Sequence, residues 1–163
     1  MTAFVGASLD QTYNAADLTG ANSGKVPGIG DIYVSHDNKR YRFVRYRAGA
    51  GAVAGAIGNA VGFYGPAGAS TGLTNEVSAD VSDTNGALAG VLVGAPTDGQ
   101  YGWIQTGGVA IITPALVSGA DGNAMTLSST TDGSLKVTGA VTDAGGAVLI
   151  DSATKTVMLN CPT

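Results

Sequence analysis

The side chains that most often carry out catalysis are scarce in this chain. His36 is the single histidine, so a serine–histidine–aspartate triad would have to use it. It stands beside the turn signal Asp37-Asn38, and no Gly-x-Ser-x-Gly nucleophile elbow accompanies it. Cys161, the single cysteine, has no basic partner in the sequence, and a zinc site needs a cluster of such ligands. We interpret His36 as a surface-turn residue and Cys161 as a packed or exposed thiol.

The carboxylates leave more alternatives open. The chain has 12 acidic residues, so two carboxyl groups placed for glycoside hydrolysis are one open alternative. The corresponding protein class is a small β-barrel hydrolase that uses Glu76 and aspartates. Asp80, Asp83 and Asp121 could bind calcium, although no EF-hand loop is present. Aspartate is also a common turn residue, which explains most of these positions more simply. We therefore expect no enzyme activity, no cofactor, no metal and no small-molecule substrate.

The composition is typical of a glycine-rich β protein. The 163 residues include 26 glycines, only 12% are charged, the net charge is −4 and the mean hydropathy is +0.20. Low charge with positive hydropathy argues against intrinsic disorder, and an acidic balance argues against direct nucleic-acid binding. No apolar run approaches the length of a membrane-spanning helix, and residues 1–20 are not expected to be a signal peptide.

One β-rich domain with an arm is the organisation that these features favour. We assign residues 1–28 to an extended arm and residues 29–163 to the domain, made of a basic hairpin (29–47) and a core (48–163). The arm either frays or lies along a neighbouring subunit. We expect an all-β fold, an antiparallel meander that forms a small sandwich or barrel.

The stretch from Gly99 to Thr113 is expected to be central, because it holds the single tryptophan between apolar runs. Gly107-Gly108 accepts the positive φ angles of a two-residue hairpin turn. A turn there places Trp103 opposite Ile112, and Ile104 opposite Ile111, with the two pairs on opposite faces. Such a hairpin is buried on both faces, or one of its faces meets a partner.

The basic hairpin holds five of the eight basic residues. A turn at Asp37-Asn38 pairs Val34 with Tyr41 and Ile32 with Phe43 on an inward face, and a bulge is expected after Phe43. The outward face then carries Arg40 and Arg42. This face is open to three interpretations: a solvated surface, contact with an acidic protein surface, or contact with nucleic acid.

Four further turns complete the predicted strands. Asn85-Gly86 is expected to join strands 76–82 and 87–95, and Asp98-Gly99 to pair Val93 with Ile104. Asp132-Gly133 is expected to pair Leu127 with Thr138, and residues 152–155 to join strands 147–151 and 156–159.

The layout of the second half resembles the small decoration, or cement, proteins of tailed-bacteriophage capsids. The similarity covers roughly residues 48–160, and residues 1–47 match less well. Its segments follow in order: GVLV (90–93), GQYGWIQTGG (99–108), DGNAMTLS (121–128), DGSL (132–135), GAVL (146–149) and TVML (156–159).

This resemblance implies a structural protein on the outer surface of the virion, made in the host cytoplasm, commonly trimeric and bridging neighbouring major capsid proteins. A β-rich binding module of a phage fibre or receptor-binding tip is the alternative. Arginines and large aromatic side chains are enriched at interface hot spots. The interface candidates are Arg40, Arg42, Arg45, Arg47, Tyr101 and Trp103, with a core role equally open for Trp103.

Overall fold

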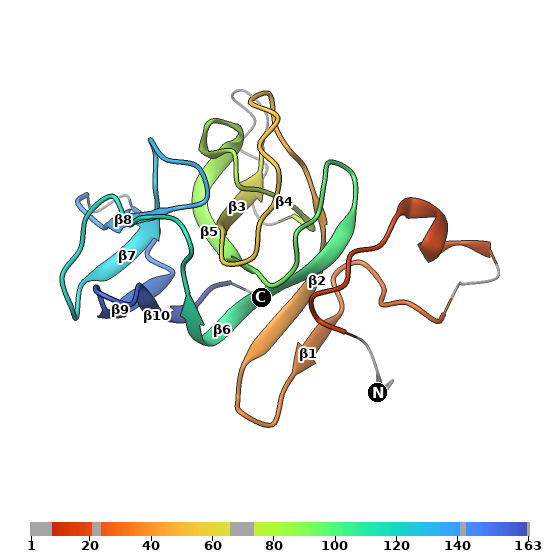
Figure 1. Ribbon diagram of the computed structural model, residues 1–163, viewed down its shortest axis with the longest axis horizontal. Coiled ribbons are helices and arrows are strands. Elements are labelled where there is room, and N and C mark those ends of the chain that lie inside the picture. Colours follow the sequence, from red (N-terminus) through yellow and green to blue (C-terminus); the bar gives the residue numbers. More distant parts are fainter. Residues whose placement is uncertain (1–7, 21–23, 66–73, 141–142, 163) are drawn as a thin grey trace.

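The computed structural model describes residues 8–20, 24–65, 74–140 and 143–162, and in this part of the chain the fold is all-β (Figure 1). Five strands form a closed barrel and further strands lie outside it. The expected all-β class with a small barrel is therefore confirmed. Within the same residues, no helix is long and apolar enough to cross a membrane.

The barrel closes because its first and last strands pair with each other. The strand order is β2 (Arg40–Tyr46), β4 (Glu76–Ser78), β3 (Ala60–Tyr64), β5 (Thr84–Leu92) and β6 (Tyr101–Ile111), and β6 returns to β2. The β2–β4 pair is parallel and the other pairs are antiparallel. Inward-facing side chains such as Val44, Phe63 and Ile104 fill the interior, each with at most 1% of its surface exposed.

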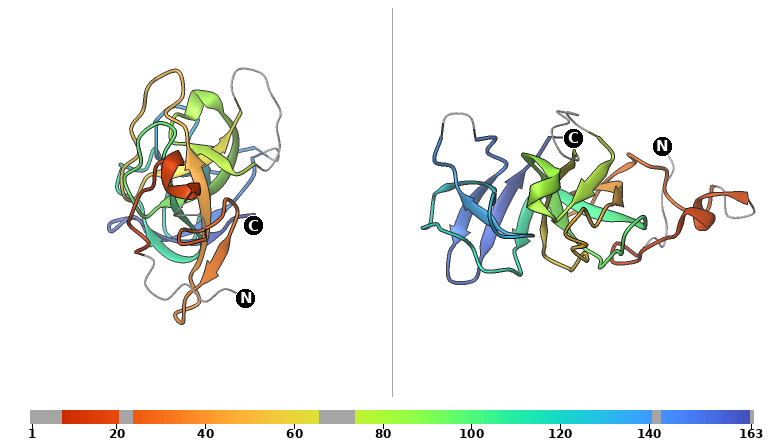
Figure 2. Two further views of the ribbon diagram at one scale, coloured as in Figure 1. Left: turned by 90° about the vertical axis from the view of Figure 1, so that its right-hand side faces the viewer. Right: turned by 90° about the horizontal axis from the view of Figure 1, so that it is seen from above.

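A second sheet extends from the far half of β6. Its further strands are β10 (Thr156–Asn160), β9 (Ala147–Asp151), β7 (Ala124–Leu127) and β8 (Leu135–Val137), in that order. One face of this sheet packs on the outside of the barrel: Leu88 and Val91 from β5 share a core with Leu149, Val157 and other inward side chains of the sheet. In Figure 1 these strands form one end of the molecule, and the right-hand view of Figure 2 shows them at the same end, seen from above.

The expected hairpin turn at Gly107-Gly108 is wrong, because β6 continues through both glycines without a break. Gly108 has φ +86°, so it uses the positive φ predicted for a turn. It uses that freedom to bend a continuous strand, which leaves β2 near Gly107 and continues beside β10. The pairs Trp103–Ile112 and Ile104–Ile111 therefore do not form, although the expected central position of this strand is confirmed.

The basic hairpin forms, but its register differs by one residue from the expected one. β1 (Ile32–Val34) pairs Val34 with Arg40, because Asn38 at φ +62° completes a three-residue loop where a two-residue turn was expected. A one-residue shift exchanges the faces of β1, so Ile32 and Val34 are exposed. The irregularity in β2 lies between residues 40 and 41 and not after residue 43.

The other turns are partly as expected. Asn85-Gly86 is not a turn: both residues lie within β5, where pairing with β3 is irregular. The Asp98-Gly99 turn joins β5 to β6 with Leu92 opposite Ile104, again one residue from the expected register. The β7–β8 hairpin forms with Leu127 opposite Leu135, not Thr138, and the β9–β10 hairpin forms as predicted.

The described part of the predicted arm packs on the barrel. A short 3-10 helix, η1 (Ala15–Leu18), follows Tyr13, whose backbone bonds in both directions with that of Tyr101. The Tyr13 ring meets Phe43 edge to face with centroids 5.8 Å apart. Residues 8–20 thus cover one outer side of β2 and β6.

Replacing Gly90 with alanine is expected to destabilise the barrel, because the added Cβ would lie 2.6 Å from the backbone oxygen of Gln105. Forcing β5 away from β6 should lower the free energy of unfolding by about 1–3 kcal/mol. Urea unfolding, followed by the fluorescence of Trp103, measures this change. Gly139→Ala is the matched control, since nothing lies within 4 Å of its added Cβ. Equal midpoints for the two variants would contradict the close approach of β5 and β6.

Candidate functional site

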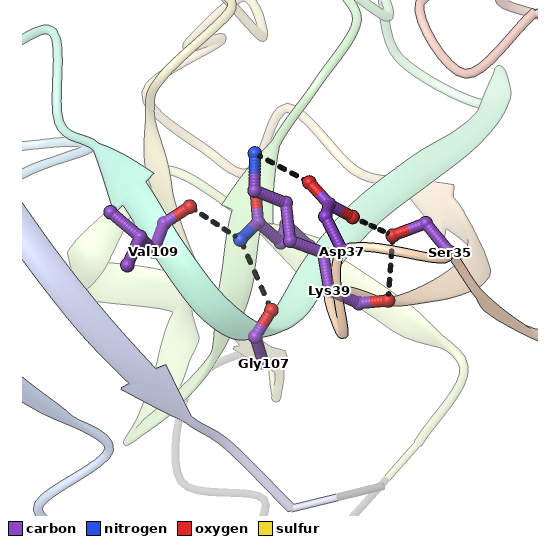
Figure 3. Close-up of polar contacts among 6 residues, drawn as sticks. Ser35, Asp37, Lys39, Gly107 and Val109 are labelled. Carbon is purple, nitrogen blue, oxygen red and sulfur yellow. Dashed lines mark hydrogen bonds and ion pairs between the residues drawn. The ribbon is translucent and has the colours of Figure 1, made fainter.

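The bend of β6 is held by one buried amide. Gln105 is 6% exposed, and its Nε2 donates to the carbonyl oxygens of Gly107 at 3.1 Å and Val109 at 2.9 Å. Figure 3 shows these two carbonyls with Lys39, Asp37 and Ser35 beside them. The amide thus links two backbone carbonyl groups on either side of Gly108.

A cleft of about 430 Å³ lies beside this bend. Its apolar walls include Ile57, Val109 and Ile111, which are 59%, 41% and 62% exposed. Gly58 and Thr113 also line it, and Thr113 Oγ1 donates to the Ile57 carbonyl at 2.7 Å. The wall is tight there, because a Cβ on Gly58 would lie 2.0 Å from Thr113 Oγ.

The cleft has a positively charged residue, Lys39, in its lining. Lys39 pairs with Asp37 at 3.4 Å, with both side chains partly exposed. The Ser35 hydroxyl also donates to Asp37, and this bond, followed by the contacts with Lys39, lowers the pKa of the Asp37 carboxyl. The pair is exposed enough for the ammonium group to exchange Asp37 for another carboxylate.

An apolar face adjoins the cleft on the outside of the second sheet. Val109 lies opposite Met158, and Met158 lies opposite Val148, so the three side chains form a row across β6, β10 and β9. Ile111 and Ile150 extend the same face along their strands. All five are exposed, by 41–62%. We call Val109, Ile111, Val148, Ile150 and Met158 the outer face.

The outer face was not predicted from the sequence, although a signal for it exists. Residues 109–112, 147–150 and 157–159 are uninterrupted apolar runs. Such runs are typical of strands covered on both faces. In these three strands, successive side chains point alternately into the buried core and to the surface. Each apolar run therefore contributes to both the core and the outer face.

The predicted arginines are dispersed along β2. Arg40 reaches the end of the outer face, where its Nη2 donates to Asn160 at 3.4 Å and its side chain covers Gly107. Arg42 donates to Asn75 at 2.6 Å, and its other amino group is buried without a partner among the described residues. Arg40 is thus the predicted arginine that lies beside the outer face.

The two remaining arginines form other contacts. Arg45 pairs with Glu76 at 3.3 Å and lies over the Tyr101 ring, 5.8 Å from its centroid. Arg47 lies over the ring of Tyr64 at 5.4 Å. Both guanidinium groups therefore stack on aromatic faces and help cover the barrel.

Trp103 and Tyr101 are buried in an aromatic cluster. Trp103 is 1% exposed and meets Phe43 edge to face at 5.3 Å, and Tyr101 stacks on the other side of Phe43. The arm residue Tyr13 belongs to the same cluster. In the described structure Trp103 therefore has the core role that was left open for it, and the indole is not on the surface.

Asp80 and Asp83 lie at one loop, residues 49–51, and Asp121 lies apart from them. Asp80 accepts from the backbone of Gly51 at 2.8 Å and Asp83 from that of Ala50 at 2.5 Å, whereas Asp121 binds the Ser152 backbone elsewhere. These carboxylates fill sites made by backbone N–H groups, which attract anions. Among the described residues, no three histidine, cysteine, aspartate or glutamate side chains are placed to hold a metal ion.

The other candidate nucleophiles take ordinary positions. His36 lies in the exposed hairpin loop. Cys161 is 4% exposed, and burial raises the pKa of its thiol to about 12. A thiol with so high a pKa stays protonated at neutral pH.

Comparison of the chain with models of protein families, with curated proteins and with solved structures found no match.

Asp80→Asn is expected to lower the free energy of unfolding by about 1 kcal/mol at neutral pH. The hydroxyl of Ser82 and the backbone N–H groups of Gly51 and Ser82 lower the pKa of the Asp80 carboxyl. A carboxyl whose pKa is lower in the folded state than in the unfolded state stabilises the fold at a pH above its unfolded-state pKa. This stabilisation is lost as the pH falls through the folded-state pKa. The gap between urea midpoints of wild type and variant should therefore narrow below about pH 4. A gap that stays constant into strong acid would contradict this account.

Proposed function

We propose that this chain is a structural virion protein that decorates the outside of a tailed-phage capsid and stabilises it by bridging major capsid proteins. The observation that carries the proposal is the outer face, five large apolar side chains exposed side by side. Contiguous apolar patches on soluble proteins commonly mark protein–protein interaction sites. The resemblance to capsid decoration proteins supplies the identity of the partner.

The surroundings of the outer face support a protein partner. Arg40 and Lys39 lie near one end of it and Asp151 at the other, so a polar rim borders an apolar centre. This is the usual anatomy of a protein interface. Repeated weak contacts on a regular shell gain strength through high effective concentration, so a homotrimer, the proposed assembly, would hold the shell more firmly than one copy.

A fibre or receptor-binding tip is favoured less by the described residues. Recognition of cells or glycans at a loop end would favour exposed aromatic side chains there. The aromatic residues in the described part of the chain are buried or half-buried, and its exposed large apolar side chains are aliphatic residues and methionine.

The test uses capsids of the encoding phage prepared without this protein. Added wild-type chain should co-sediment with them saturably and raise the temperature at which they release DNA. A Val148→Glu, Met158→Glu double variant should bind at least about tenfold more weakly, because it places charges at the centre of an apolar contact. Val117→Glu is the matched control, since Val117 is 46% exposed in a loop outside the outer face.

Two results would contradict the proposal. If the wild-type chain does not sediment with the capsids, the capsid is not its partner. Capsids that release DNA at the same temperature with and without bound chain would show that binding does not stabilise the shell.

A further inference from the structure

The cleft beside the β6 bend differs from the flat outer face in shape and charge. Its floor and walls are largely aliphatic, and its volume of about 430 Å³ exceeds that of a single side chain. It opens next to Val109 and Ile111, which belong to the outer face as well. A partner lying on the outer face can therefore insert a side chain into the cleft.

Two polar groups of the cleft are engaged within the chain. The amide nitrogen of Gln105 binds two carbonyl groups of its own strand, and Thr113 Oγ binds the Ile57 carbonyl. Both bonds lie within the chain and the rest of the lining is largely aliphatic, so the cleft offers mainly apolar contact. An aliphatic side chain fits this lining, because burial of a polar group without a partner would be costly.

The rim adds a requirement for negative charge. Lys39 is the charged residue of the lining, and its ammonium group forms a partly exposed pair with Asp37. Arg40, the next residue, lies at the same end of the outer face. A cation at the edge of an apolar cleft, with a second cation at the near end of the outer face, complements a carboxylate that follows or precedes an aliphatic side chain.

We propose that the cleft lined by Lys39, Ile57, Val109 and Ile111 binds an extended segment of the partner that carries an aliphatic side chain next to a carboxylate. The aliphatic side chain lies between Ile57 and Val109, and the carboxylate pairs with Lys39. This proposal rests on the proposed function only for the identity of the partner, a major capsid protein. The chemistry of the cleft stands by itself.

The direct test is an NMR titration of the ¹⁵N-labelled chain with two blocked hexapeptides, one with a leucine between two aspartates and one with asparagines in their place. The aspartate peptide should shift the amide signals of residues 39, 57, 109 and 111, and should bind at least about fivefold more tightly than the asparagine peptide. Lys39→Gln should remove the difference between the peptides. Lys25→Gln, at an exposed lysine outside the cleft, should preserve it.

Three outcomes would overturn the proposal: no shifts at millimolar peptide, equal binding of the two peptides, or shifts confined to residues outside the cleft. The fluorescence of Trp103 confirms that each variant is folded.

Capsid co-sedimentation separates this proposal from the proposed function. If wild type and Lys39→Gln bind the capsids equally well, the proposed binding of a carboxylate at the cleft is contradicted, whereas the proposed decoration function stands. Peptide binding without capsid binding would support the cleft and contradict the decoration function.

Discussion

The bend of β6 at Gly107 and Gly108 is the feature on which both halves of the structure depend. Before the bend, β6 closes the barrel against β2, and after it the same strand begins the second sheet beside β10. Arg40 covers Gly107 so closely that a Cβ there would lie 2.6 Å from its Nε. The Gln105 amide then ties the two segments together through the carbonyls of Gly107 and Val109.

This bend explains why an apolar surface remains exposed. The far half of β6 turns its Ala110 side toward the barrel, where the second sheet packs, and its Val109 and Ile111 side toward solvent. β10 and β9 follow the same alternation, so their outward apolar side chains come into line with those of β6. The hydrophobic effect favours covering such a surface, and the cations at its end restrict which partner can cover it.

Parts of this arrangement could be predicted from the sequence. The β9–β10 hairpin, the basic hairpin and the central position of the Trp103 strand follow from apolar patterning and turn residues. The roles of Gly107-Gly108 and Asn85-Gly86 could not be predicted, because a glycine with positive φ serves a tight turn and a strand bulge equally well. Only the pairing of distant strands distinguishes these two outcomes.

The candidate site was harder to predict for a related reason. The conspicuous residues, Trp103 and Tyr101, are used to pack the arm against strands β2 and β6 of the barrel. The exposed face is made of ordinary valines and isoleucines, whose direction depends on a strand register that one residue in a loop can reverse. Asn38 in the hairpin loop shows how large this effect is, since it reverses the faces of all of β1.

The most direct measurement is an electron cryomicroscopy reconstruction of capsids decorated with this protein. If the bent strand presents the working surface, capsid density should lie against Val109, Val148 and Met158 and enter the cleft beside Lys39. Capsid density confined to the opposite side of the molecule, with these side chains facing open solvent, would contradict the account.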